Sequence, residues 1–103
     1  MAEIIWTHSA ARSLNDVAEY IAIENPAAAR ALVKDVFSVV ERLDTFPMSG
    51  RVVPEIPDLP YREVICNPCR VLYKYDEGAC CVYMIGVMRQ EQALLNFFDN
   101  FKE

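Results

Sequence analysis

The segment from Arg62 to Arg89 most constrains the fold, because only there do apolar and polar residues alternate with period two. This period sends successive side chains of a strand to opposite faces. Asn67-Pro68 and Asp76-Glu77-Gly78 are turn signals, since proline fixes its own φ and the other residue types tolerate tight backbone conformations. The segment therefore predicts an antiparallel meander with strands over 62–66, 70–75 and 80–89.

The residues before the meander predict one strand and two helices. Residues 3–7 form a short apolar run, and we expect this strand beside the last strand of the meander. Apolar residues then recur at helical spacing over 10–21 and 29–43. Asn25-Pro26 separates the two runs, because asparagine caps a helix and proline is tolerated in its first turn. So short a connection predicts an antiparallel helical hairpin across one face of the sheet.

Two further segments complete the predicted fold. Prolines punctuate residues 44–60, which we expect to form an extended loop with a short strand at 51–53. Loop residues often bind partners, so Arg51 and Glu55 are candidates, and a plain connector is the alternative. After Arg89, apolar residues at helical spacing predict a C-terminal helix, and its phenylalanines either pack on the sheet or meet another protein.

The predicted fold class is α+β, in a single domain over 1–103. It consists of a short N-terminal strand, an antiparallel α-hairpin packed on a small antiparallel β-sheet, and a C-terminal helix. Hydrophobic residues make up 53% of the 103 residues, which excludes disorder. That fraction is high for a small monomer, so we expect a partner chain to cover part of the apolar surface.

The charge distribution excludes some functions. A net charge of −5 opposes a general nucleic-acid coat, which would neutralise many phosphates. Residues 1–50 carry seven acidic residues against four basic ones, whereas the strand region is mildly basic, either as solvated surface or as a binding face. No apolar run is long enough to span a bilayer and the N-terminus lacks a signal pattern, so we expect a cytoplasmic protein without a membrane partner.

The sequence holds few groups that indicate chemistry. His8 is the only histidine, and no catalytic triad can be assembled around it. Three scattered glycines form no phosphate-binding loop, so no cofactor is implied. The cysteines are expected to be reduced thiols in the cytosol, with a Cys66–Cys69 disulfide or a zinc site as alternatives. Arginines of the meander and of the loop before it would cluster if the strands pair as predicted, and guanidinium groups suit phosphate or carboxylate.

Several short motifs are spread over nearly the whole chain. They are Ile5-Trp6-Thr7, Asn25-Pro26-Ala27-Ala28-Ala29, Gly50-Arg51-Val52-Val53-Pro54-Glu55, Arg62-Glu63 and Arg70-Val71-Leu72-Tyr73. Together they resemble the ParE branch of the RelE/ParE superfamily of type II toxins. The third motif, with Arg62-Glu63 at this distance, is the most specific of them.

The resemblance implies a toxin that poisons DNA gyrase by binding and that forms a hetero-oligomer with an antitoxin. RelE-like relatives instead cut mRNA on the ribosome, and a non-toxic member that only binds its antitoxin is a third reading. The expected target-binding residues are Arg51, Glu55, Arg62, Arg70, Arg89, Phe97, Phe98 and Phe101. A ribonuclease would use Arg62, Glu63, Arg70 and Arg89. The expected antitoxin-binding residues on the hairpin are Leu14, Val17, Ile21, Val33 and Phe37.

Overall fold

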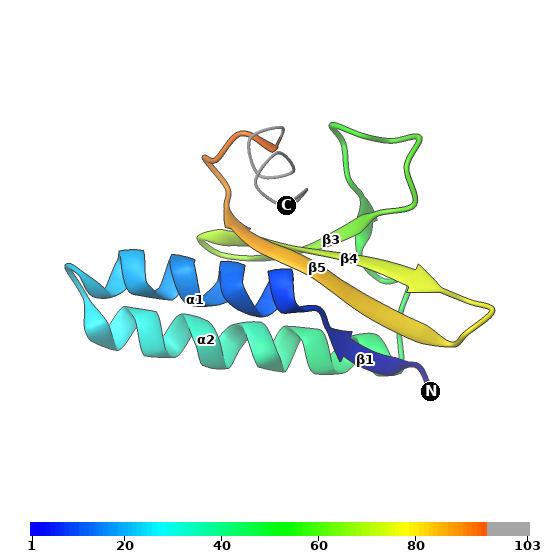
Figure 1. Cartoon of the computed structure of the whole chain (residues 1–103), viewed down its shortest axis with the longest axis horizontal. Helices are drawn as coiled ribbons and strands as arrows, with labels where there is room; N and C mark the ends of the chain where they lie inside the picture. Colours follow the sequence, from blue (N-terminus) through cyan, green and yellow to red (C-terminus); the bar gives the residue numbers. More distant parts are fainter. Residues whose placement is uncertain (95–103) are drawn as a thin grey trace.

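The computed structural model describes residues 1–94 of the chain (Figure 1). The helices are α1 (His8–Ala22) and α2 (Pro26–Glu41), and a short 3-10 turn, η1 (Arg42–Asp44), follows α2. The strands are β1 (Glu3–Trp6), β2 (Arg51–Val52), β3 (Arg62–Cys66), β4 (Cys69–Asp76) and β5 (Cys81–Arg89). The predicted C-terminal helix lies outside the described residues.

The five strands form one sheet in the order β1-β5-β4-β3-β2. The predicted meander is confirmed, since β3, β4 and β5 pair antiparallel in succession. The prediction of a wholly antiparallel sheet is wrong, because β1 runs parallel to β5, with Glu3 opposite Cys81 and Trp6 opposite Met84. Tight turns force antiparallel pairing, whereas the long connection from β1 through both helices leaves its direction free.

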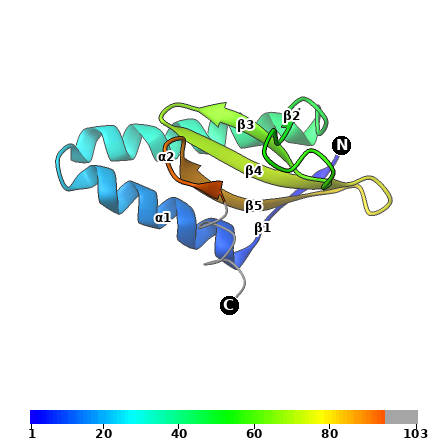
Figure 2. The same cartoon turned by 90° about the horizontal axis from the view of Figure 1, so that it is seen from above.

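Both helices begin where the sequence places a capping residue. The Thr7 side chain accepts a hydrogen bond from Ala10 N at 3.1 Å, and Asn25 Oδ1 accepts one from Ala28 N at 3.0 Å. Pro26 then occupies the first turn of α2, where its missing N–H costs nothing. The two helices lie side by side as the predicted antiparallel hairpin on one side of the sheet (Figures 1 and 2).

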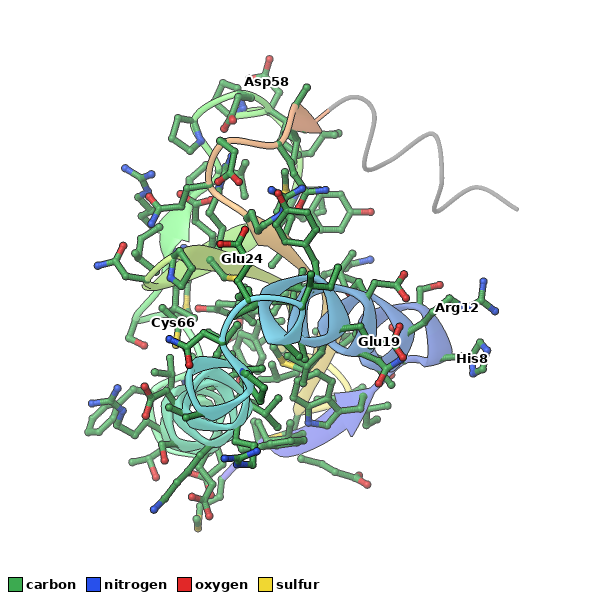
Figure 3. The ribbon with its side chains drawn as sticks, turned by 90° about the vertical axis from the view of Figure 1, so that its left-hand side faces the viewer. His8, Arg12, Glu19, Glu24, Asp58 and Cys66 are labelled. Atoms are coloured by element: carbon green, nitrogen blue, oxygen red, sulfur yellow. The ribbon has the colours of Figure 1, made fainter. Side chains whose placement is uncertain are left out.

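The sheet is buried on both faces. We call the face that carries Val64, Val71 and Tyr73 the helix face, because these residues pack with both helices in the larger core. The opposite loop face carries Leu72 and Met88, which pack with the 53–61 loop in a second, smaller core. Figure 3 shows Asp58, at the tip of this loop, far from Glu19 on α1.

The second core explains part of the high apolar content. Its members are Val53, Leu72, Ile85, Met88 and Leu94, with Ile56, Tyr61 and Tyr83 packed against them. Residues 69–73 of β4 and most of β5 are therefore continuously buried instead of half-solvated. The loop of this chain thus covers apolar surface that composition alone assigned to a partner.

A serine of α1 ties the helix to the edge of β5. Because β1 ends opposite Met84, the second half of β5 is paired with β4 but has no strand on the β1 side. There, Val87 N donates to Ser13 Oγ at 2.8 Å, and Arg89 N donates to Gln92 Oε1 at 2.7 Å. These two side chains provide hydrogen-bond acceptors for backbone N–H groups of β5 that β1 does not reach. Within residues 1–94, no helix combines the length and apolar composition needed to cross a membrane.

Candidate functional site

Four charged side chains on the loop face form one chain of ion pairs, which we call the ion-pair chain: Arg51, Glu63, Arg70 and Glu55. Glu63 is at its centre, accepting from Arg51 Nε at 2.5 Å and from Arg70 Nε at 2.6 Å. Arg70 also donates from Nη1 and Nη2 to the two oxygens of Glu55, at 2.7 and 2.8 Å. Two positive and two negative groups thus neutralise one another.

Strand register places three members of the ion-pair chain together. Arg51 of β2 lies opposite Glu63 of β3, so their side chains share a face. Arg70 of β4 lies opposite Ile65, the next residue of β3 on that face. Glu55 comes from the 53–61 loop, which Val53, fully buried, anchors to the sheet. The proline-rich loop therefore delivers a carboxylate to an arginine that is distant in sequence.

Burial differs sharply along the ion-pair chain. The side chains of Glu63 and Arg70 are 0% and 7% exposed, whereas those of Arg51 and Glu55 are 62% and 46% exposed. The hydrogen bonds between Arg70 and Glu55 lower the pKa of Glu55 and raise that of Arg70. A buried charge is tolerated only when it is paired, and Glu63 and Arg70 are paired with each other.

Arg62 lies on the helix face, away from the ion-pair chain. Its Nη1 donates to the backbone oxygen of Gly50 at 2.7 Å. Gly50 N donates in turn to Tyr73 Oη at 2.9 Å, and burial raises the pKa of this phenol. A Cβ at Gly50 would lie 2.6 Å from Tyr73 Oη and 2.7 Å from Glu63 O. Glycine is therefore required where the loop backbone enters the sheet.

Arg89 lies at the other end of the sheet. Its guanidinium carbon is 4.0 Å from the centroid of the Tyr20 ring, and its Nη1 donates to Glu91 at 2.5 Å. Arg89 is opposite Cys69 in β4, and Arg62 is opposite Tyr73, so the two arginines are separated by roughly 13 Å along the strands. Cation–π contact holds the Arg89 side chain against α1.

The predicted cluster of Arg51, Arg62, Arg70 and Arg89 is thus wrong for two of its four members. The structure brings together Arg51 and Arg70, each already paired with glutamate, and places Arg62 and Arg89 elsewhere. The reason is the period of the strands, which sends Arg62 and its neighbour Glu63 to opposite faces. The network with Glu55 was not predicted. A signal for it exists in the sequence, since arginine and glutamate alternate between the loop and β3.

The residues predicted to bind an antitoxin occupy different environments. Leu14 and Val17 are each only 6% exposed, because they pack in the core between the helices and the sheet. Ile21 and Val33 are partly buried against the same core, whereas Phe37 is 46% exposed. The Phe37 ring lies 5.1 Å from the ring of Trp6, centroid to centroid. Phe97, Phe98 and Phe101 lie outside the described residues.

The four cysteines are free. Cys66 and Cys69 are partners in the β3–β4 register and both are buried. Burial raises the pKa of both thiols, and that of Cys69 to about 11. Such thiols are protonated at neutral pH and react slowly. Within residues 1–94, no group of three or more histidine, cysteine or acidic side chains is placed to hold a metal ion.

An exposed apolar patch surrounds β2, and we did not predict it. Its members Phe46, Met48, Val52 and Leu59 are between 43% and 63% exposed. They line two adjoining surface pockets that share Met48, Tyr75 and Glu77. The patch could have been predicted from the large apolar residues that stand beside the prolines of this loop.

Comparison with known proteins gives one family. A family profile described as "ParE toxin of type II toxin-antitoxin system, parDE" matches residues 4–94. No curated protein sequence matches this chain significantly.

Two solved structures have the same fold. One is a chromosomal ParDE toxin–antitoxin system from P. aeruginosa, with a TM-score of 0.71 and 20% identity over 88% of this chain and 98% of that one. The other is the toxin–antitoxin complex RelBE2 from Mycobacterium tuberculosis, with a TM-score of 0.58 and 19% identity over 86% of this chain and 98% of that one.

Proposed function

Because this chain belongs to the ParE toxin family of type II toxin–antitoxin systems, we propose that it blocks replication by binding DNA gyrase and that a cognate antitoxin neutralises it. Both partners would meet it in the cytoplasm. The solved structures of the same fold are described as toxin–antitoxin systems or complexes, which supports an antitoxin partner for this chain.

The state of the ion-pair chain favours binding over RNA cleavage. A general base must reach the proton that it removes, and a phosphate clamp needs free N–H donors. The Glu63 side chain has no exposed surface, and both of its oxygens accept from arginines. Arg70 is 7% exposed and donates to two glutamates. Two of the four residues expected of a ribonuclease are therefore already engaged within the protein.

Arginines at the surface remain available for a macromolecular target. The Arg51 side chain is 62% exposed, and its Nε is the atom that bonds to Glu63 in the ion-pair chain. The Arg89 side chain is 23% exposed and rests on Tyr20. Arginine and tyrosine are enriched at the energetic centres of protein interfaces. We therefore assign Arg51 and Arg89 to the gyrase-binding surface.

The test is a paired assay of the purified, antitoxin-free protein. DNA supercoiling by gyrase, with detection of cleaved DNA, is measured alongside a translation extract probed for cut messages. Inhibited supercoiling with intact message is the expected result. Cut message with normal supercoiling would replace the proposal with a ribosome-dependent ribonuclease, and unaffected growth on expression without antitoxin would indicate a non-toxic member.

A matched pair of variants locates the target surface. Arg89→Ala is expected to raise the concentration for half-inhibition of gyrase about tenfold, because an interface arginine that contributes strongly to binding is removed. Arg12→Ala is the control, since Arg12 is an exposed arginine of α1 with a hydrogen bond to His8, 3.0 Å away. Equal inhibition by both variants would remove Arg89 from the surface.

A further inference from the structure

The exposed apolar patch around β2, which we call the β2 patch, also contains backbone groups without partners. Its members are Phe46, Met48, Val52 and Leu59. Strand β2 is the last strand of the sheet, and Val53 N donates to Tyr61 O, so Val53 faces β3. Alternate residues of a strand face opposite sides, so Val52 directs its N–H and C=O away from β3. Within residues 1–94, neither of these groups has a hydrogen-bond partner. Such an open edge is a template for another strand.

Charged side chains of both signs line one pocket of the β2 patch. Arg62 and Glu77 border the same pocket as Met48, Val52 and Tyr75. In the part of the chain that the structure describes, neither Arg62 nor Glu77 forms an ion pair, although Arg62 donates to backbone oxygens of the loop. A purely basic or purely acidic patch would select a partner of opposite charge. This patch instead matches a surface that carries the same two charges.

The size of this pocket favours a protein surface over a small ligand. Its volume is about 230 Å³, whereas small-molecule sites typically have volumes of about 300–1,000 Å³. Around it, the exposed side chains of Phe46 and Leu59 extend the apolar surface beyond the pocket itself. Contiguous exposed apolar surface with a polar rim is typical of protein–protein contacts. The β2 patch is therefore suited to another protein chain.

A second copy of this chain fits the backbone and the charges together. A two-fold axis places the same surface on both sides of an interface, so that a contact from one residue to another occurs twice. With the axis beside Val52, the two β2 strands run antiparallel, and the N–H and C=O of each Val52 bond to those of the other. The same axis brings Arg62 of each copy toward Glu77 of the other. Both sets of unpaired groups are then satisfied by one partner.

The net charge of −5 opposes self-association only weakly. At physiological ionic strength, charges are screened beyond about 8 Å, so the acidic residues far from the β2 patch contribute little. The two contacts between Arg62 and Glu77 would lie within that distance. Arg51 shares the loop face with Glu63, to which it is bonded, and so it stays outside this patch.

We propose that two copies of this chain associate through the β2 patch around a two-fold axis, with Val52 paired to Val52 of the second copy and Arg62 bonded to Glu77 of the second copy. This inference goes beyond the proposed function and does not rest on it, because self-association requires neither gyrase nor an antitoxin.

Cysteine trapping tests the two-fold pairing directly. Residues opposite each other in a hydrogen-bonded antiparallel pair have Cα atoms about 5.5 Å apart, which suits a disulfide. The background variant Cys80→Ser removes the exposed native thiol. In oxidised glutathione, Val52→Cys should then form a disulfide-linked dimer at least about tenfold faster than Ile65→Cys, because association holds the two thiols together. Ile65 is the matched control, since it is 42% exposed against 43% for Val52. Equal rates for the two variants would overturn the inference.

The purified, antitoxin-free chain should be in equilibrium between monomer and dimer, which sedimentation over a concentration series measures. Glu77→Lys should raise the dissociation constant at least about tenfold, because it replaces two attractive contacts by two repulsive ones. Glu19→Lys, at an exposed position of α1, is the matched control, since it changes the net charge by the same amount. Its dimer should be at least as stable as that of the wild type. Equal weakening by both variants would contradict the contact of Glu77 with Arg62 and overturn the inference.

Three further outcomes would also overturn the inference. The first is a monomer at every concentration. The second is a dimer that Val52→Asp leaves unchanged, because a different surface would then associate. The third is a monomeric chain in which Val52→Asp weakens inhibition of gyrase, because the β2 patch would then contact that target. Thermal melts verify that each variant is folded. The paired assay of gyrase and translation tests the proposed function separately, so the two proposals can fail independently.

Discussion

Glu63 holds two arginines while its side chain has no contact with solvent. A carboxylate in such a place is stable only because both of its oxygens accept charge-assisted hydrogen bonds. Arg70 is likewise a buried charge with two partners, Glu63 and Glu55. At the scale of single residues, the ion-pair chain is therefore a structural clamp between β3, β4 and the 53–61 loop.

Removing the central charge should destabilise the protein strongly. Glu63→Gln leaves Arg70 buried with one acidic partner, so we expect a loss of about 3–5 kcal/mol in the free energy of unfolding. Glu55→Gln, at the half-exposed end, should cost at most about 1 kcal/mol. Urea unfolding of both variants measures the difference. Similar losses for the two variants would contradict the clamp.

The pKa of Glu55 adds a dependence on pH. Its pKa is lowered in the folded protein by the hydrogen bonds from Arg70. The stabilisation is therefore fully present above the unfolded-state value of about 4.3, and it is lost as pH falls through the lower folded value. The difference in unfolding free energy between the wild type and Glu55→Gln should be constant from pH 7 to about pH 5 and shrink below it. A difference that grows on acidification would reverse the sign of this linkage.

At Gly50 the backbone lies close to the Tyr73 side chain and to the backbone of Glu63. Gly50→Ala should cost about 1–3 kcal/mol, because the new methyl group would collide with Tyr73 Oη and Glu63 O. Gly78→Ala is the control, since its Cβ would meet only Asp76 Oδ1, at 3.5 Å. Thermal unfolding of the two variants measures the difference in stability. An unchanged stability of Gly50→Ala would show that the loop can shift.

Polar contacts at strand edges also connect elements of the fold. Ser13 Oγ accepts from Val87 N and donates to Ala10 O, so it connects α1 to β5. Ser13→Ala should cost about 1–3 kcal/mol, because it leaves a part-buried N–H unsatisfied. It should also accelerate hydrogen exchange at Val87. Ser38→Ala, on the exposed side of α2, should change stability by less than about 0.5 kcal/mol.

Most elements could be predicted from the sequence, and their pairing only in part. The limits of β3 follow from its alternation and from the Asn67-Pro68 turn, and the start of α2 follows from Asn25-Pro26. The direction of β1 could not be predicted, since no local signal records how a strand pairs with one far along the chain. The glutamate partners of Arg51 and Arg70 depend on register and on the path of the 53–61 loop, and neither can be derived from residue types alone.

The whole molecule consists of two cores that share one sheet. Leu72 belongs to the smaller core on the loop face, whereas Trp6 packs against the larger one on the helix face. Because the same strands bound both cores, we expect them to unfold together. Leu72→Ala should lower stability by about 2–5 kcal/mol, and the fluorescence of Trp6, the only tryptophan, should report the full shift. Two separate transitions, with Trp6 fluorescence unchanged in the first, would contradict a shared core.

The parallel pairing of β1 with β5 also determines how early the chain can fold during its synthesis. Thr7 donates its side-chain hydrogen bond to Met84 O, 77 residues further along the chain. At a synthesis rate of 5–20 residues per second, the first strand waits about 4–15 s before its partner exists. The larger core cannot close during that time, so the nascent chain acquires its native surface only after β5 has been synthesised.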